Sequence, residues 1–340
     1  MNLLVSYELF LAKIITFIII SILALILFYT IIKRKKNTQS KIKVTLLKEN
    51  YENIKTKILL STMQNFEKKI WFEKEKLKNK KNKKKILDNK NKKKILYILD
   101  FKGDVYANKV IGLREEISAI LSVANKNDEV LLRLESSGGV IHGYGLAASQ
   151  LNRLRQKGIR LIVSIDKIAA SGGYMMACVA DYIVSAPFAI IGSIGVVGQI
   201  PNFNKLLKKC SIDIELHTAG DHKRTLTMFG KNTESTRNKF CEELNTTHQL
   251  FKNFIKEMRP SLDIESVSNG EHWFGTVALE KKLVDQISTS DDILMSKMED
   301  FTLLSIQYIY NKKILERFTT SIADNIRKNL LKIFFYKNYL

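Results

Sequence analysis

The sequence is poor in cysteine and proline. It has three of each in 340 residues, together with 16 glycines. Three scattered cysteines are too few for a disulfide framework or a zinc knuckle. The low proline and glycine content excludes collagen-like and low-complexity chains. No Gly-x-x-x-x-Gly-Lys-Ser/Thr sequence is present, so a P-loop nucleotide site has no support. Because 45% of the residues are hydrophobic, the chain can bury a sizeable core.

The formal net charge of +21 is concentrated in one segment. Residues 33–94 carry 23 basic and 6 acidic side chains, whereas residues 95–340 carry 31 basic and 27 acidic ones. A DNA-binding domain would carry its excess charge on a folded face, so we expect no specific nucleic-acid partner. The lysine-rich segment holds an anionic membrane surface, tethers nucleic acid electrostatically without sequence specificity, or serves as a solvated spacer. We expect its Lys78–Lys94 block to be disordered.

One apolar run is long enough to cross a membrane. Ile14–Ile32 has 19 residues without a charge, and a hydrocarbon core is about 30 Å thick. The run has no Ala-x-Ala site, which favours an uncleaved single-pass anchor over a signal peptide. The basic residues 33–36 follow it, and the positive-inside rule then favours a cytoplasmic C-terminal side. The uncharged stretch before Lys205 is interrupted by Pro187 and glycines, so we expect buried strands there instead.

Strands alternate with helices after residue 94, which predicts an α/β fold with a parallel sheet. The expected strands are Ile95–Phe101, Val130–Leu134, Leu161–Ile165, Tyr182–Ser185 and Ile212–His217. The expected helices are Lys109–Ala124, Gly145–Gln156, Tyr174–Val179 and Thr233–Met258. A strand at Thr302–Ile309 and a helix at Ile314–Phe335 complete the pattern. The predicted organisation is an anchor (1–32), a connector (33–94), a globular domain (95–295) and a C-terminal strand and helix (296–340).

Ser171 follows an apolar strand and precedes Gly172, Gly173 and an apolar helix. At a helix N-terminus, unpaired N–H groups and the helix dipole favour a developing negative charge. Glycines at the next two positions allow a substrate carbonyl to approach the backbone closely. These are the requirements of a nucleophilic serine with an oxyanion site. The alternative at this stage is an ordinary serine N-cap.

A second glycine-rich turn follows the predicted strand Val130–Leu134. The amides of Gly138 and Gly139 are candidate donors to an oxyanion, because strand carboxyl ends line the binding crevice of parallel sheets. The pattern Gly143-x-Gly145-x-x-Ala also fits a loose dinucleotide fingerprint. That pattern begins too far beyond the strand end, so we do not expect a cofactor there.

A nucleophilic serine needs a base. His142 is the histidine nearest to a candidate loop, but no Asp or Glu partner in a motif supports a Ser-His-Asp arrangement. A lysine can replace histidine if its amine is neutral, a state that burial favours. Lys223 follows the apparent strand Ile212–His217 among small and polar residues. The residues alone do not distinguish it from the many other lysines.

The combined motifs closely resemble the SohB-type membrane proteases of the signal peptide peptidase A family. The resemblance includes Asp100-Phe-Lys-Gly, the Glu135–Gly145 turn, Val163–Pro187, the Lys223 segment and Gly270-Glu-His-Trp-Phe-Gly. It implies an α/β Clp protease/crotonase-like superhelix with an N-terminal transmembrane helix. It also implies a membrane-anchored serine endopeptidase in the bacterial inner membrane, where relatives with a periplasmic orientation occur. The same fold hosts acyl-CoA enzymes, and a catalytically silent scaffold is a further alternative.

The resemblance assigns roles to individual residues. Ser171 corresponds to the nucleophile and Lys223 to its general base. Gly138 or Gly139, together with Gly172, corresponds to the oxyanion hole. The residues that correspond to the substrate-binding cleft are Gly192, Ser193, Ile194 and Gly195.

The resemblance also implies the reaction and the partners. Hydrolysis of a peptide or protein substrate proceeds through an acyl-enzyme, without a metal or an organic cofactor. Half-length relatives assemble into rings in which neighbouring subunits complete each site, so a homo-oligomer is implied. Signal-peptide remnants or membrane-associated polypeptides are the expected substrates, and membrane lipid is the expected surroundings of the anchor.

Overall fold

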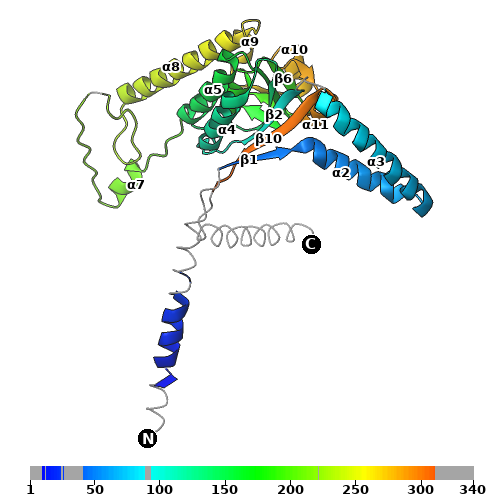
Figure 1. Ribbon diagram of the computed structural model, residues 1–340. Coiled ribbons are helices and arrows are strands. Elements are labelled where there is room, and N and C mark those ends of the chain that lie inside the picture. Colours follow the sequence, from blue (N-terminus) through cyan, green and yellow to red (C-terminus); the bar gives the residue numbers. More distant parts are fainter. Residues whose placement is uncertain are drawn as a thin grey trace, which may run out of the picture. The chain divides into compact units, whose positions relative to one another are not determined.

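The computed structural model describes residues 10–11, 13–23, 26, 41–88, 93–220 and 222–310 (Figure 1). The chain divides into two compact units, Met1–Lys41 and Ile42–Leu340. In the first unit, residues 13–23 are helical. No helix within the described ranges combines the length and the apolar character needed to span a bilayer. Part of the predicted anchor Ile14–Ile32, and all of the predicted helix Ile314–Phe335, lie outside these ranges.

A seven-stranded sheet organises the second unit, in the order β1-β10-β2-β3-β4-β6-β9. β1 is antiparallel to its neighbour β10, and the other pairs are parallel. The strands are β1 (Ile42–Leu46), β2 (Lys94–Lys102), β3 (Glu129–Glu135), β4 (Arg160–Ile165), β6 (Tyr182–Ser185), β9 (Gln286–Ile287) and β10 (Phe301–Tyr308). The prediction of an α/β fold with a mainly parallel sheet is confirmed.

A smaller sheet has the order β5-β7-β8. Its strands are β5 (Ile168–Ala170), β7 (Ile190–Gly192) and β8 (His272–Phe274). β5 and β7 are parallel, and β8 runs antiparallel to β7. Ser136, directly after β3, forms a bridge with Ala169 of β5. This bridge places the end of β3 beside the smaller sheet.

The described part of the second unit contains helices of very different lengths. They are α2 (Leu47–Thr62), α3 (Asn65–Asp88), α4 (Val110–Val123), α5 (Ile141–Gln156), α6 (Gly172–Ala177), α7 (Asn204–Lys209), α8 (Glu234–Met258), α9 (Ile264–Val267), α10 (Gly275–Glu280) and α11 (Ser290–Lys297). The side chain of Thr233 caps α8 by accepting a hydrogen bond from the amide of Thr236. Figure 1 shows α2 and α3 extending away from the sheet.

Apolar side chains that point alternately to the two faces of the main sheet form two hydrophobic cores, one on each face. Tyr97, Leu99 and Phe101 of β2 face the larger core, to which α4, α5 and α6 contribute. Leu96 and Ile98 face a smaller core, to which α11 contributes. Since successive side chains of a strand point to opposite faces, the nearly continuous apolar run of β2 follows from burial on both sides.

Several segments differ from the predicted elements. β1, which lies within the predicted connector, is a strand of the main sheet. The predicted strand Thr302–Ile309, by contrast, agrees with β10 within one residue at each end. α3 continues to Asp88 and includes most of the lysine block that we expected to be disordered. The predicted strand Ile212–His217 is wrong, because these residues form no strand and their side chains are exposed. Its alternating pattern resembles a strand, but no neighbouring strand pairs with it.

Candidate active site

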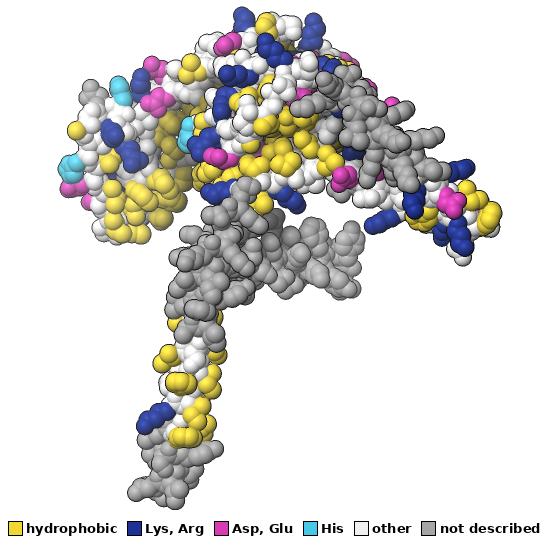
Figure 2. Space-filling view, viewed as in Figure 1, with side chains coloured by type: hydrophobic (Ala, Val, Ile, Leu, Met, Phe, Trp, Pro, Cys, Tyr) yellow, Lys and Arg dark blue, Asp and Glu magenta, His cyan; other side chains and the backbone are white. Residues whose placement is uncertain are grey.

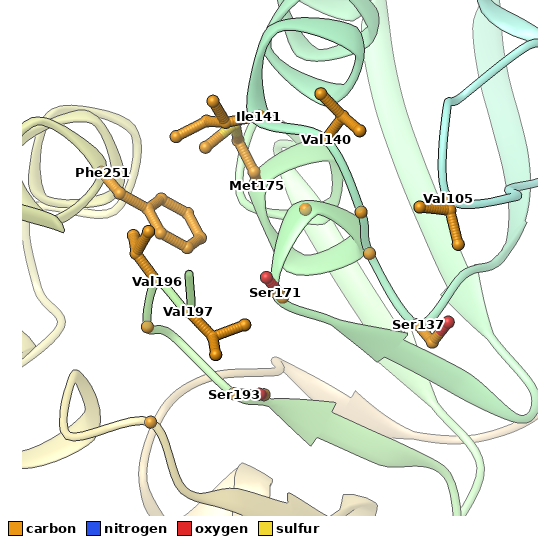
Figure 3. Close-up of a pocket in the computed structure, with 15 residues that line it drawn as sticks. Val105, Ser137, Val140, Ile141, Ser171, Met175, Ser193, Val196, Val197 and Phe251 are labelled. Carbon is orange, nitrogen blue, oxygen red and sulfur yellow. The ribbon is translucent and has the colours of Figure 1, made fainter. Parts of the chain in front are cut away.

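Ser171 lies between β5 and α6, in a tight strand-to-helix turn. Its backbone has φ 52° and ψ −118°, a conformation with positive φ that residues other than glycine rarely adopt. The Ser171 amide donates to the carbonyl of Gly192, 2.8 Å away. Its hydroxyl forms no capping hydrogen bond with α6. Figure 3 shows Ser171 at the edge of a cavity, so this serine is not an ordinary N-cap.

The glycine-rich turn after β3 packs directly against the Ser171 turn. Gly138 has φ +87°, and a Cβ there would lie 2.8 Å from the Ala170 carbonyl oxygen, the Gly172 amide nitrogen and the Ser171 Cβ. A Cβ on Gly139 would lie 2.1 Å from the carbonyl oxygen of Val105. Both positions therefore exclude a side chain. The two turns that the sequence singled out form one site.

The hydrogen bonds of this turn distinguish between the two candidate amides. The Gly138 amide donates to the hydroxyl of Ser136, 3.1 Å away. Within the described ranges, the amides of Gly139 and Gly172 have no hydrogen-bond acceptor. A free N–H group is what an oxyanion requires. Gly139 and Gly172 are therefore the available donors, and the Gly138 amide is already engaged.

A cavity of about 670 Å³ opens beside Ser171 (Figure 3). Its walls consist of apolar side chains, glycines and three serines, with no acid, base or histidine among the described lining residues. The apolar side chains are Val105, Val140, Ile141, Met175, Val196, Val197 and Phe251. Such walls suit an apolar or extended polypeptide segment.

The predicted substrate-binding residues follow β7. Ser193 and Gly195 line the cavity, and Gly192 accepts the hydrogen bond from the Ser171 amide. Ser193 has φ 51°, and its amide donates to the carbonyl of Glu271 at 2.6 Å. Ile194 is buried. The structure therefore brings this segment to Ser171, although Ile194 does not line the cavity.

Lys223 lies apart from this group. It belongs to a loop without regular structure, its side chain is exposed, and it is not among the residues that line the cavity. Its amide donates to the carbonyl of Gly220, 3.1 Å away. His142 at the start of α5 is also exposed and does not line the cavity. Among the described residues of one chain, no acid, base or histidine lines the cavity beside the serine and the glycines.

Family models match almost the whole chain. Peptidase family S49 N-terminal matches residues 2–151, and Peptidase family S49 matches residues 153–303. The chain belongs to peptidase family S49. It is therefore a serine-type peptidase.

Curated relatives place the chain among the SohB-type S49 peptidases. A probable protease SohB from Buchnera aphidicola of Acyrthosiphon pisum is 84% identical, with all of both chains aligned. A probable protease SohB from Haemophilus influenzae is 59% identical over 66% of this chain and 63% of its own length. A solved membrane-bound stomatin-specific protease with a substrate peptide shares 13% identity, covering 69% of this chain and 100% of its own, with a TM-score of 0.41.

The sequence alone did not indicate a buried hydrogen-bond network behind the glycine-rich turn after β3 of this S49 peptidase. Ser136 is 2% exposed, and its hydroxyl lies 2.6 Å from the hydroxyl of Tyr144. Tyr144 donates in turn to the carbonyl of Asp104 at 2.7 Å. Gly103 was the one sequence feature that could have indicated this network. A Cβ there would lie 2.3 Å from the Tyr144 Oη, so the network leaves no room for a side chain. The apolar walls supplied by Val105 and by Phe251 of α8 were also missed.

Proposed function

We propose that this S49 peptidase is a membrane-anchored endopeptidase in which Ser171 and Lys223 form the catalytic dyad. Ser171 attacks the scissile carbonyl and forms an acyl-enzyme. The amides of Gly139 and Gly172 stabilise the oxyanion of the tetrahedral intermediate. The single observation that carries the proposal is the uncapped Ser171 hydroxyl beside a cavity.

The predicted base is the amine of Lys223. In its neutral form it accepts the Ser171 proton as the Oγ–carbonyl bond forms, then donates that proton to the leaving amine. It next accepts a proton from the water that attacks the ester. That proton returns to Ser171 as the acyl group leaves. Each turnover consumes one water and requires no oxidant or cofactor.

Lys223 of a neighbouring copy is the proposed partner of Ser171. The cavity of one chain has no titratable side chain among its described lining residues, and Lys223 is exposed in the same chain. A second copy can deliver the amine and also exclude water from it, which favours the neutral form. The proposed enzyme is therefore a homo-oligomer whose sites are completed between subunits.

The apolar cavity walls support a preference for apolar peptide segments. We propose signal-peptide remnants or membrane-associated polypeptides as substrates, because such segments are apolar and lie close to an anchored enzyme. Ile14–Ile32 is the proposed anchor, and the proposed location is the bacterial inner membrane. A reporter that is active only outside the cytoplasm, fused after residue 340, tests the cytoplasmic orientation that the residues 33–36 favour.

Hydrolysis of a model peptide tests the dyad. We expect Ser171→Ala and Lys223→Ala each to abolish cleavage while the protein remains folded, because each variant removes one half of the proton-transfer pair. Product formation is followed by mass spectrometry, with Lys231→Ala as a matched substitution of an exposed loop lysine. Retained cleavage in Ser171→Ala or Lys223→Ala removes that residue from the dyad. Loss of cleavage in all three variants would contradict a specific role for Lys223.

A further inference from the structure

α2, the short turn after it and α3 form an extension that we call the helical arm (Leu47–Asp88). The arm joins the body at its start, where Leu47 packs against the smaller core. Among the arm residues whose side chains the structure describes, every side-chain hydrogen bond is local. For example, Thr62 donates to the Leu59 carbonyl, and the Gln64 amide donates to the Glu67 carboxylate. The rest of the arm therefore has few contacts that hold it to the body.

Large apolar side chains of the arm are exposed. Their exposed fractions range from 40% to 73%, and the residues are Ile54, Ile58, Phe66, Ile70 and Phe72. Figure 2 shows hydrophobic side chains beside lysines at the far end of the arm. Helices in proteins gain most of their stability from packing an apolar face. The arm thus presents an apolar surface that stays exposed among the described residues.

The same arm is strongly basic. α3 contains ten lysines and four acidic residues, a net charge of +6. None of the arm lysines whose side chains are described forms an ion pair. Lysines also stand four residues apart in α3, as at Lys74 and Lys78 and at Lys76 and Lys80. Like charges at this spacing destabilise an isolated helix, and a negatively charged partner removes that cost.

We infer that the helical arm binds the surface of an anionic lipid bilayer. Lysines near an anionic bilayer are attracted to it, and neighbouring aromatic and aliphatic side chains can enter the headgroup region. Trp71 and Phe72, in contact with each other, are of the type enriched at this depth. A nucleic acid would leave Ile54 and Ile58 in water. A second copy of the arm would face the same net positive charge.

The position of the arm in the chain agrees with this partner. Fourteen residues, 33–46, separate it from the apolar run Ile14–Ile32. If that run is the anchor, the arm begins close to a bilayer. The inference does not depend on the Ser171 chemistry, since it concerns a surface outside the catalytic cavity.

Fluorescence of Trp71 tests the inference directly. The chain has two tryptophans, so Trp273→Phe leaves Trp71 as the single probe. The full chain is reconstituted into vesicles of phosphatidylcholine, and into vesicles with equal parts of phosphatidylglycerol. In the anionic vesicles we expect brominated acyl chains to quench Trp71 and aqueous acrylamide to quench it poorly. In the neutral vesicles we expect brominated acyl chains to quench Trp71 poorly and acrylamide to quench it strongly, although the proposed anchor is inserted in both vesicle types.

A matched pair of variants controls for charge. The arm variant carries Lys68→Gln, Lys69→Gln, Lys74→Gln and Lys76→Gln, and the control carries Lys126→Gln, Lys157→Gln, Lys209→Gln and Lys256→Gln at exposed positions of the body. We expect Trp71 quenching to become the same in the two vesicle types for the arm variant, and to stay different for the control. Equal quenching of the Trp273→Phe protein in both vesicle types would overturn the inference. So would shielding of Trp71 by duplex DNA or by self-association instead of anionic lipid.

Discussion

Ser136 connects the glycine-rich turn after β3 to Tyr144 of α5. The Tyr144 hydroxyl donates to the Asp104 carbonyl, so the proton between the two hydroxyls comes from Ser136. The Gly138 amide donates to Ser136 in turn. The backbone of Ser136 also bonds both to Ile168 and to Ala170 of β5. This chain of donors holds the turn that contains the free Gly139 amide, so we propose Ser136 as a positioning residue.

Ser136→Ala tests this role. It removes the central hydroxyl and leaves the Gly138 amide unpartnered, so we expect kcat to fall roughly tenfold or more with little change in KM, because the oxyanion donor is misplaced. We expect the free energy of unfolding to fall by about 1–3 kcal/mol. Steady-state kinetics and urea denaturation measure the two effects. Ser149→Ala, an exposed serine on α5, is the control. A fall in stability with unchanged kcat would show that Ser136 is only structural.

At the scale of elements, α4 and β10 are joined through a buried carboxyl group. Glu116 of α4 accepts a hydrogen bond from the Tyr308 amide of β10 at 2.6 Å. Burial raises the pKa of Glu116 from 4.5 to about 7, and the bond from Tyr308 and the charge of Lys109 only partly oppose it. Asp100 adds a like charge that also raises it. Between these two pKa values, the folded protein retains a proton that the unfolded chain releases.

Because the folded form binds this proton more tightly, the titration of Glu116 by itself lowers the free energy of unfolding as the pH rises from about 4.5 to about 7. Glu116→Gln removes the titration and keeps an acceptor for the Tyr308 amide. We therefore expect the variant to be more stable than the wild type at pH 8 by up to about 3 kcal/mol, and similar to it near pH 4.5. Denaturant unfolding at both pH values measures this. An equal stability difference at the two pH values would contradict the raised pKa.

The elements that the sequence predicted are those with strong local patterns. β6 has the predicted bounds, and β2, β3 and β4 agree within one residue at each end, because β-branched apolar runs identify buried strands. α5 begins at Ile141, before the predicted Gly145, and its N-cap residue has no capping side chain to mark the start. β1 could not be predicted, because its partner β10 lies more than 250 residues away in the sequence.

The candidate site was predictable to a similar degree. Ser171, Gly138 and Gly139 stand directly after strands, where a parallel sheet gathers its loops. Which glycine amide is free depends on the Ser136 hydroxyl, a tertiary contact with no local pattern. Lys223 was assigned by family resemblance alone, and it stays a prediction.

At the scale of the whole molecule, subunit mixing tests whether neighbouring chains share a site. Ser171→Ala and Lys223→Ala chains are each inactive in the proposed mechanism. If Lys223 acts on a neighbouring Ser171, mixed oligomers contain some sites with both groups intact. We expect co-expression to restore a substantial fraction of wild-type cleavage, measured with the model peptide. No recovery, with both chains in the same oligomer, would contradict sharing of sites between subunits.

The Ser171 hydroxyl is the proposed nucleophile of this S49 peptidase. Covalent labelling of the full chain with a serine-directed phosphonylating probe, followed by peptide mass spectrometry, tests it most directly. We expect an adduct on Ser171 that is absent in Ser171→Ala and forms much more slowly in Lys223→Ala. An adduct on another residue, or an unlabelled Ser171 in protein that cleaves peptides, would contradict it.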